Sequence, residues 1–182
     1  MSTIAEARDV LPAGTWKLDP AHSQVGFAVD YMIGTFRGSF SPVEATLEVP
    51  ENGTPTLAGS TKVANVKVQD ANLEAHLQSP DFFDAERTPE LTFSSTEIVR
   101  SGDELAVRGE LSVRGVSLPV QLAGAVREPI TDPYGQERIG LTLTGAVDRT
   151  QFGLDWNNPL PSGEPALANR VALTAELYLV KA

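Results

Sequence analysis

Apolar and polar residues alternate along most of this chain, which is the pattern of β-strands that bury one face. In the segment 24–32, for example, Val25, Phe27 and Val29 fall on one face, and polar or small residues fall on the other. Turn residues such as Asn52-Gly53 separate the alternating segments. We expect strands over residues 15–18, 24–32, 36–49, 57–68, 91–100, 104–114, 116–128, 136–148 and 169–181. Pro42 predicts a bulge or an edge within the third of these.

About eight of these strands are long, and short turns join most of them, which favours an up-and-down antiparallel arrangement. The fold class predicted is therefore all-β, an eight-stranded antiparallel barrel whose apolar faces point inward. Closing the sheet also removes the edge strands that promote aggregation. One short helix is expected after the third main strand, over 70–78, because Leu73 and Leu77 are four residues apart and Asp70 suits an N-cap.

Two segments break the alternation. The first, His76 to Phe93 (HLQSPDFFDAERTPELTF), places Phe82 and Phe83 between two prolines, and prolines interrupt regular pairing. It is either a plug or mouth for something that the strands enclose, or simply a seal at one end of the core. The second, 149–168, contains Phe152, Trp156 and three prolines, and it either covers a mouth or closes the core.

The interior of an eight-stranded barrel is either filled by side chains or left open for one ligand. Large interior side chains are few here, and most inward positions carry Val, Leu, Ala or Gly. Strands of this length give a barrel about 23 Å tall, which can hold an elongated apolar cavity. An apolar chain would gain about 0.8 kcal/mol per buried methylene. The alternative is a solid core, which would indicate an interaction module.

Composition narrows the classes of function. With 182 residues the chain fits one domain, expected as a flexible arm over 1–14 followed by a barrel over 15–182. The net charge of −10 argues against nucleic acid or an anionic membrane surface as the main partner. Two histidines and no cysteine make a structural metal site improbable and exclude disulfides. Without a recognisable secretory signal or membrane span, we expect a cytoplasmic protein.

Four motifs, in order, strongly resemble the YceI-like polyisoprenoid-binding family. They are LDPAHS at 18–23 with VGF and FRGSF after it, HLQSPDFFD at 76–84, GELSVRGVSLPV at 109–120, and FGLDW at 152–156. The resemblance covers the chain from Gly14 onward. The chain departs from the family pattern at Tyr31, where a His is common, at Leu73-Glu74, where Arg-Asp is common, and at Gln151, which replaces a common Asp.

The resemblance implies an extended lipocalin-like barrel that binds a long isoprenoid, either a polyprenyl diphosphate or a lipid with a quinone-like head. The expected protein is a non-enzymatic carrier or store, without a cofactor or metal, and a homodimer. Many members of the family are secreted to the periplasm, whereas this chain lacks the signal. The candidate ligand-binding residues are His22, Phe27, Val29, Phe36, Phe40, His76, Leu77, Phe82, Phe83, Arg87, Phe93, Leu111, Leu143, Phe152 and Trp156.

Several polar residues are also candidates for binding or catalysis, and most of them have a simpler structural interpretation as well. Arg37 and Arg87 suit a diphosphate, because guanidinium binds phosphate bidentately, although Arg87 can equally pair with Glu86 or Glu90. His76 lies either inside the barrel end or on the solvent face of the helix. An alternative function is a hydrolase or isomerase that uses His22, His76 and a carboxylate. His22 would not activate the adjacent Ser23, since neighbouring residues on a strand face opposite sides.

Overall fold

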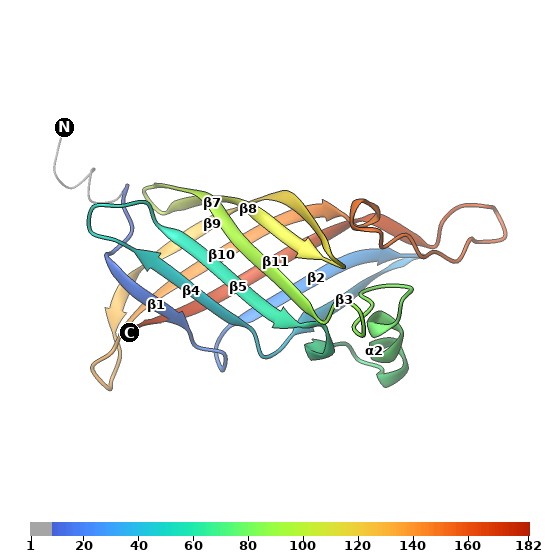
Figure 1. The fold of residues 1–182 in the computed structure, drawn as a ribbon, viewed down its shortest axis with the longest axis horizontal. Coiled ribbons are helices and arrows are strands. Elements are labelled where there is room, and N and C mark those ends of the chain that lie inside the picture. The colour runs from blue at the N-terminus through green and yellow to red at the C-terminus, as the bar shows by residue number, and fades with distance from the viewer. Residues whose placement is uncertain (1–8) are drawn as a thin grey trace.

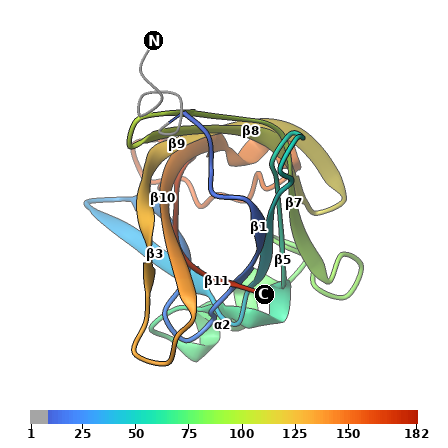
Figure 2. The same ribbon diagram turned by 90° about the vertical axis from the view of Figure 1, so that its left-hand side faces the viewer.

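The strands form one continuous antiparallel sheet, and eight of them close into a barrel (Figures 1 and 2). The structure is a computed structural model and describes residues 9–182. The strands of the barrel are β1 (Gly14–Leu18), β4 (Glu44–Val49), β5 (Thr56–Lys62), β7 (Glu90–Ser101), β8 (Glu104–Val113), β9 (Val116–Thr131), β10 (Glu137–Asp148) and β11 (Leu167–Lys181). The pairing of β1 with β11, where Leu18 lies opposite Leu179, closes the ring. The predicted all-β barrel is therefore confirmed.

Three further strands extend the sheet from β11: β2 (Gln24–Tyr31), β3 (Gly34–Phe40) and β6 (Val66–Lys67). The strand β11 consequently has three partners. It pairs with β10 along most of its length, with β2 from Leu167 to Glu176, and with β1 at its C-terminal end. This arrangement makes one end of the molecule wider than the barrel itself, because β2 and β3 project from the wall (Figure 2).

The predicted helix is confirmed as α2 (Ala71–Gln78). The Asp70 carboxylate accepts hydrogen bonds from the backbone N–H groups of Asn72, at 2.8 Å, and Leu73, at 3.2 Å, so it caps the helix as expected. Two short 3₁₀ helices, η1 (Val63–Asn65) and η2 (Arg149–Phe152), lie in the connections. The helix α2 and the segment after it lie at one end of the barrel (Figure 1).

Two predicted strands were each too long. The segment 36–49 is not one bulged strand but two, β3 and β4, which have different partners. The break falls at Ser41-Pro42, where proline cannot donate to a ladder, and the Pro42 carbonyl instead accepts from Thr61 and Asn65 side chains. The segment 57–68 is likewise divided, because η1 separates β5 from β6.

One half of the barrel is filled with its own side chains, and we call it the sealed half. Its largest member is Trp16, which is 1% exposed. The sealed half consists of Leu11, Trp16, Leu47, Val49, Leu105, Val107, Val126, Ile139, Leu141 and Leu179. These side chains come from six of the barrel strands and the segment before β1, so the sealed half ties the barrel together.

The chain before β1 is attached to the sealed half from Asp9 onward. Leu11 is buried, Arg100 donates to the Val10 carbonyl at 2.9 Å, and the Trp16 indole N–H donates to the Pro12 carbonyl at 3.0 Å. The flexible arm predicted for 1–14 is thus anchored over its second part. Its first part, residues 1–8, lies outside the described residues.

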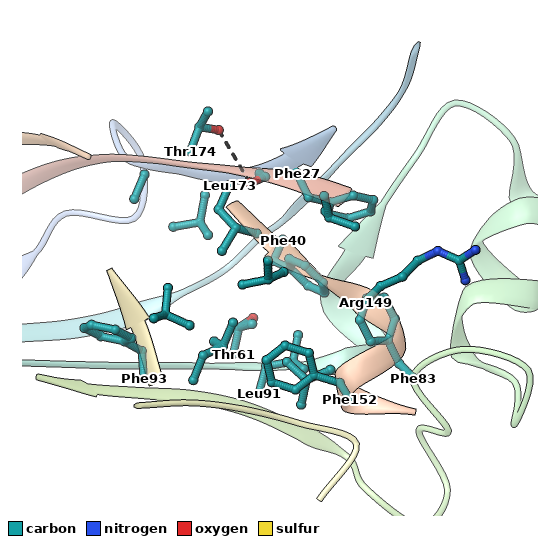
Figure 3. Close-up of a pocket in the computed structure, with 18 of the residues that line it drawn as sticks. Phe27, Phe40, Thr61, Phe83, Leu91, Phe93, Arg149, Phe152, Leu173 and Thr174 are labelled. Carbon is teal, nitrogen blue, oxygen red and sulfur yellow. Dashed lines mark hydrogen bonds between the residues drawn. The ribbon is translucent and has the colours of Figure 1, made fainter. Parts of the chain in front are cut away.

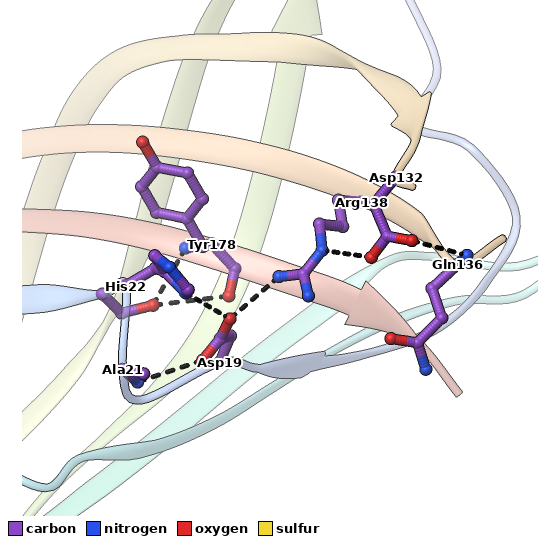
Figure 4. A network of polar contacts seen from close by, with 8 residues as sticks. Asp19, Ala21, His22, Asp132, Gln136, Arg138 and Tyr178 are labelled. Atoms are coloured by element: carbon purple, nitrogen blue, oxygen red, sulfur yellow. Dashed lines mark hydrogen bonds and ion pairs between the residues drawn. The ribbon is translucent and has the colours of Figure 1, made fainter. Parts of the chain in front are cut away.

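A network of charged side chains lies on the outer surface over the sealed half (Figure 4). Arg138 on β10 donates to the carboxylates of Asp19 and Asp132, both at 2.8 Å, and Asp19 also contacts His22 Nδ1 at 2.7 Å. These contacts connect the β1–β2 turn to the β9–β10 hairpin. Arg138, and to a lesser degree His22, lowers the pKa of Asp19 to about 2, and Arg138 also lowers the pKa of Asp132.

Candidate ligand-binding cavity

The other half of the barrel, toward α2, encloses an elongated apolar cavity of about 440 Å³ (Figure 3). Its floor consists of Leu57, Leu143 and Leu177, which pack against the sealed half. Along β11 the lining runs from Leu177 to Leu167, which corresponds to a depth of roughly 25 Å for a tilted strand. This volume lies within the range of small-molecule sites, and almost the whole lining is hydrocarbon. We call this part the hollow half.

Small residues at inward positions explain why this half is hollow. A Cβ added to Gly38 would lie 2.4 Å from Cζ of Phe27, so the Phe27 ring covers the glycine on the neighbouring strand. The Phe93 ring covers Gly109 in the same way, with its Cζ at 2.6 Å from the added Cβ. The rings therefore lie along the wall of the barrel, and the centre of the lumen stays open.

Aromatic rings form one side of the lumen. The Phe27 ring centroid lies 6.2 Å from that of Phe36, 5.9 Å from that of Phe40 and 6.5 Å from that of Phe83. Phe83 also meets Phe40 edge-to-face at 5.8 Å. These separations are those of favourable aromatic pairs, and the four rings hold one another in place.

Backbone hydrogen bonds and one arginine hold the segment that carries Phe82 and Phe83. Arg114 in the β8–β9 turn donates to the carbonyls of Pro80, at 2.6 Å, and Phe82, at 2.7 Å. The Thr88 hydroxyl donates to the Phe83 carbonyl at 2.7 Å. This proline-bracketed segment is thus a fixed cover over the end of the barrel, and Phe82 and Phe83 both line the cavity.

A second aromatic group surrounds His76. Its ring lies 5.0 Å, centroid to centroid, from both Phe82 and Trp156, edge-to-face in each case. The Nε2 atom of His76 is 2.9 Å from the Asp81 carboxylate, which orients the imidazole. His76 therefore joins the helix α2 to the 153–166 loop, and it is among the residues that line the cavity. Of the two positions considered for His76, the cavity side is the one observed.

Arg149 borders the cavity and was not expected from the sequence. Its stem lines the lumen, and its guanidinium turns away from the other labelled side chains (Figure 3). The guanidinium donates to the carbonyls of Leu154, Trp156, Leu167 and Ala168, at 2.6 to 3.3 Å, and so engages four of its five N–H donors. Burial lowers the pKa of Arg149, and Asp148 and Asp155 partly offset that shift. Its observed contacts hold the 153–166 loop in place.

The structure places every candidate residue at the cavity except two. His22 and Arg87 are corrections to the expected set. His22 lies outside, beside Tyr178, where its side chain is 64% exposed and bonded to Asp19. Arg87 is 85% exposed and pairs with Asp84, rather than with Glu86 or Glu90. Sequence reasoning also missed Tyr31 and Leu73 as lining residues, although both are positions at which the chain departs from the family pattern.

The arrangement does not support the alternative catalytic site. His22 packs on Tyr178 outside the barrel, and His76 lies at the cavity, so the two imidazoles do not share a site. Among residues 9–182, no three acidic or histidine side chains lie close enough together to hold a metal ion. None of the helices in the described part of the chain has the length and hydrophobicity needed to span a bilayer.

The fold and the cavity together define a class, a closed antiparallel β-barrel that is sealed at one end and hollow at the other. The chain belongs to the YceI-like domain family, whose profile matches residues 16–179. The UPF0312 protein plu2095 of Photorhabdus laumondii is 30% identical over 155 residues, which cover 77% of this chain and 76% of that protein. Protein YceI of Escherichia coli O157:H7 is 27% identical over 147 residues, with 78% of this chain and 77% of that protein covered.

Solved structures share the fold. BcnA of Burkholderia cenocepacia superposes with a TM-score of 0.75 at 20% identity, over 88% of this chain and 98% of that chain. A polyisoprenoid binding domain from Saccharophagus degradans, implicated in plant cell wall breakdown, superposes with a TM-score of 0.67 at 12% identity, over 92% and 98% of the two chains. At 20% and 12% identity, this structural similarity establishes the barrel fold alone.

Proposed function

We propose that this protein binds a long-chain isoprenoid lipid in the hollow half of its barrel and acts as its carrier or store. The observation that carries the proposal is the elongated cavity with its hydrocarbon lining. A branched apolar chain that enters it gains about 0.8 kcal/mol per methylene, so several isoprene units outweigh the cost of association. The polyisoprenoid binding domain among the structural relatives supports the same class of ligand.

The mouth favours an uncharged head such as a quinone over a diphosphate. Tyr31, Leu73 and Trp156 line the cavity there, and Arg149 has four of its five donors engaged by carbonyls. Of the two cations expected for a diphosphate, Arg87 lies in solvent and Arg37 lies on the outer face of the sheet, away from the cavity. A diphosphate taken into this mouth would lose hydration without gaining charged partners, which is costly. A quinone head can instead stack on Trp156 and accept a hydrogen bond from the Tyr31 hydroxyl.

Mass spectrometry of an organic extract of the purified protein tests the proposal directly. We expect an isoprenoid lipid in the extract, and we expect delipidated protein to take up a polyprenyl quinone more tightly than a polyprenyl diphosphate of equal tail length. Quenching of Trp156 fluorescence reports the uptake, and Trp156→Phe identifies the signal because Trp16 is buried in the sealed half. An empty extract combined with no uptake of either lipid would refute the proposal.

Tighter uptake of the diphosphate would refute only the preference for an uncharged head. Homodimerisation, the absence of catalysis and a cytoplasmic location remain predictions of this proposal. Light scattering tests the homodimer, and cell fractionation tests the cytoplasmic location. Turnover of a small ester or isoprenoid substrate that disappears in His76→Ala would support the enzymatic alternative instead.

A further inference from the structure

The β2–β3 hairpin ends in two apolar residues in water. Ile33 is 106% exposed and Met32 is 56% exposed. Met32 also has a positive φ of 49°, which a long side chain rarely adopts. The β7–β8 and β8–β9 hairpins have equally short turns, and each contains a glycine at a positive φ, Gly102 or Gly115, although Arg114 in the β8–β9 turn has a positive φ as well. The sequence at the β2–β3 tip therefore reduces both turn stability and solubility, which points to a role outside folding.

This tip lies beside the mouth of the cavity. Tyr31 and Gly34 pair directly below the tip, and Tyr31 and Phe36 both line the cavity. Leu73 of α2 also lines the cavity while 43% of it is exposed, so the lumen reaches the surface at this end. The Met32 N–H donates to the Ala166 carbonyl at 2.8 Å, which fixes the tip against the 153–166 loop. The tip therefore projects from the α2 end of the barrel and is fixed in position there (Figures 1 and 2).

Behind the tip, the outer face of the same sheet carries a small depression of about 270 Å³. Alanines on β2 and β11 form its base, and Arg37, Arg170, Asp30 and Thr35 surround it. The ion pairs and hydrogen bonds found within residues 9–182 do not include either guanidinium. The Asp30 carboxylate accepts one hydrogen bond, from Thr35 at 3.3 Å. The depression thus presents two cations beside one carboxylate, and neither cation has a partner within the described part of the chain.

We propose that the β2–β3 hairpin docks on the surface of a zwitterionic phospholipid bilayer. Met32 and Ile33 would enter the acyl region, Arg37 and Arg170 would bind a headgroup phosphate, and Asp30 would bind the headgroup ammonium. The overall charge of −10 opposes binding to an anionic membrane, so a neutral surface is the partner that the charges fit. A two-residue tip is too small for a stable contact with a second copy of the chain, which needs about 800 Å² on each partner. The inference rests on the proposed function, since a bilayer is where an isoprenoid lipid would be loaded or delivered.

Co-sedimentation with vesicles tests the docking independently of isoprenoid binding. We expect the protein to bind vesicles of phosphatidylcholine and phosphatidylethanolamine more tightly than matched vesicles in which phosphatidylglycerol replaces the ethanolamine lipid. Ile33→Asp should weaken the binding about tenfold or more, because it removes the aliphatic side chain that would be buried in the bilayer. Arg170→Gln should weaken it about fivefold, because it removes a charge-assisted hydrogen bond to a headgroup phosphate. Tyr134→Asp is the matched control, since Tyr134 is 89% exposed in the β9–β10 hairpin beside the sealed half.

The outcomes separate this inference from the proposed function. Uptake of a polyprenyl quinone from ethanol solution should be unchanged in Ile33→Asp, and that result also shows that the variant folds. No vesicle binding by the wild-type protein, or equal losses in Ile33→Asp and Tyr134→Asp, would overturn the docking while leaving the cavity proposal intact. A change of oligomeric state in Ile33→Asp, without vesicle binding by the wild type, would assign the tip to a second copy and also overturn it.

Discussion

The sealed and hollow halves of the barrel share most of their strands but not all of them. On β8, Leu105 and Val107 fill the sealed half, whereas Gly109 and Leu111 face the hollow half. On β10, Ile139 and Leu141 are buried in the sealed half, and Gly145 follows them toward the mouth. Two differences in the wall go with this, because β2 and β3 line only the hollow half and β1 contributes Trp16 only to the sealed half. Along the shared strands, the cavity comes from the size of the inward residues, because glycine leaves the lumen open where leucine would fill it.

The largest expected effect is on stability, from a truncation in the sealed half. Leu141→Ala should lower the free energy of unfolding by about 2–5 kcal/mol, because Leu141 is packed on all sides and the change leaves a void. Leu111→Ala in the hollow half should cost only about 1–2 kcal/mol, since it enlarges a cavity that is already there. Urea unfolding of both variants measures the difference, and equal losses would contradict the division into two halves.

The next effect is on ligand uptake. Phe83→Asp places a carboxylate against Phe27 and Phe40 in the apolar wall, and we expect quinone uptake to fall at least tenfold because the charge brings water into the lumen. Thr144→Asp is the control, as Thr144 lies on the outer face of β10. Fluorescence titration of both proteins measures the contrast. Similar affinities in the two variants would show that the assigned lumen does not hold the ligand.

A smaller effect on ligand affinity should follow when one glycine of the wall is replaced by alanine. Gly38→Ala pushes the Phe27 ring into the lumen, because all three of the nearest atoms to the new Cβ belong to the side chains of Phe27 and Val68. We expect affinity for the quinone to fall about tenfold or less, and Phe27→Leu in the same protein should restore part of it. Gly59→Ala is a milder control, since its Cβ would make ordinary contacts at 3.4 Å and beyond. Loss of affinity in Gly59→Ala alone would contradict the role given to Gly38.

The smallest effect is on stability at acid pH, and it arises from the charged network on the surface over the sealed half. The pKa of Asp19 is about 2 in the folded protein against 3.8 ordinarily, so its stabilising contribution is present above pH 3.8 and is lost as pH falls toward 2. Arg138→Gln removes the main cause of that shift, and we expect the midpoint of acid unfolding to rise. Circular dichroism between pH 5 and pH 1.5 measures the midpoint, and quinone uptake at neutral pH should not change. An unchanged midpoint would show that the network does not stabilise the fold.

Much of the fold could be predicted from the sequence because a strand with one buried face leaves a periodic signal. The inward positions of Val25, Phe27 and Val29 follow from alternation alone, and the cap at Asp70 follows from local chemistry. The split at Pro42 could not be predicted, since a proline in a long alternating segment indicates either a bulge or an end. Pairing partners decide between the two, and they are far apart in the chain.

The candidate site was predictable in its aromatic part and not in its polar part. Phe82 and Phe83 were found because they interrupt the alternation, and the structure brings both to the cavity. Arg149 resembles a surface residue in the sequence, and only the fold reveals that it is buried among carbonyls. His22 was misplaced because a motif implies proximity to a site without fixing which side of the wall a side chain faces.

The three partners of β11 have a consequence for how the protein is made. Because β11 supplies the neighbour of β1, β2 and β10, no earlier part of the chain can complete the ring by itself. During synthesis, the apolar faces of the preceding strands therefore remain exposed to water or to a chaperone until β11 has left the ribosome. Contacts between residues so distant in the chain make barrel closure a slow step. The cavity is therefore incomplete until β11 is in place, and the proposed lipid can enter only the finished molecule.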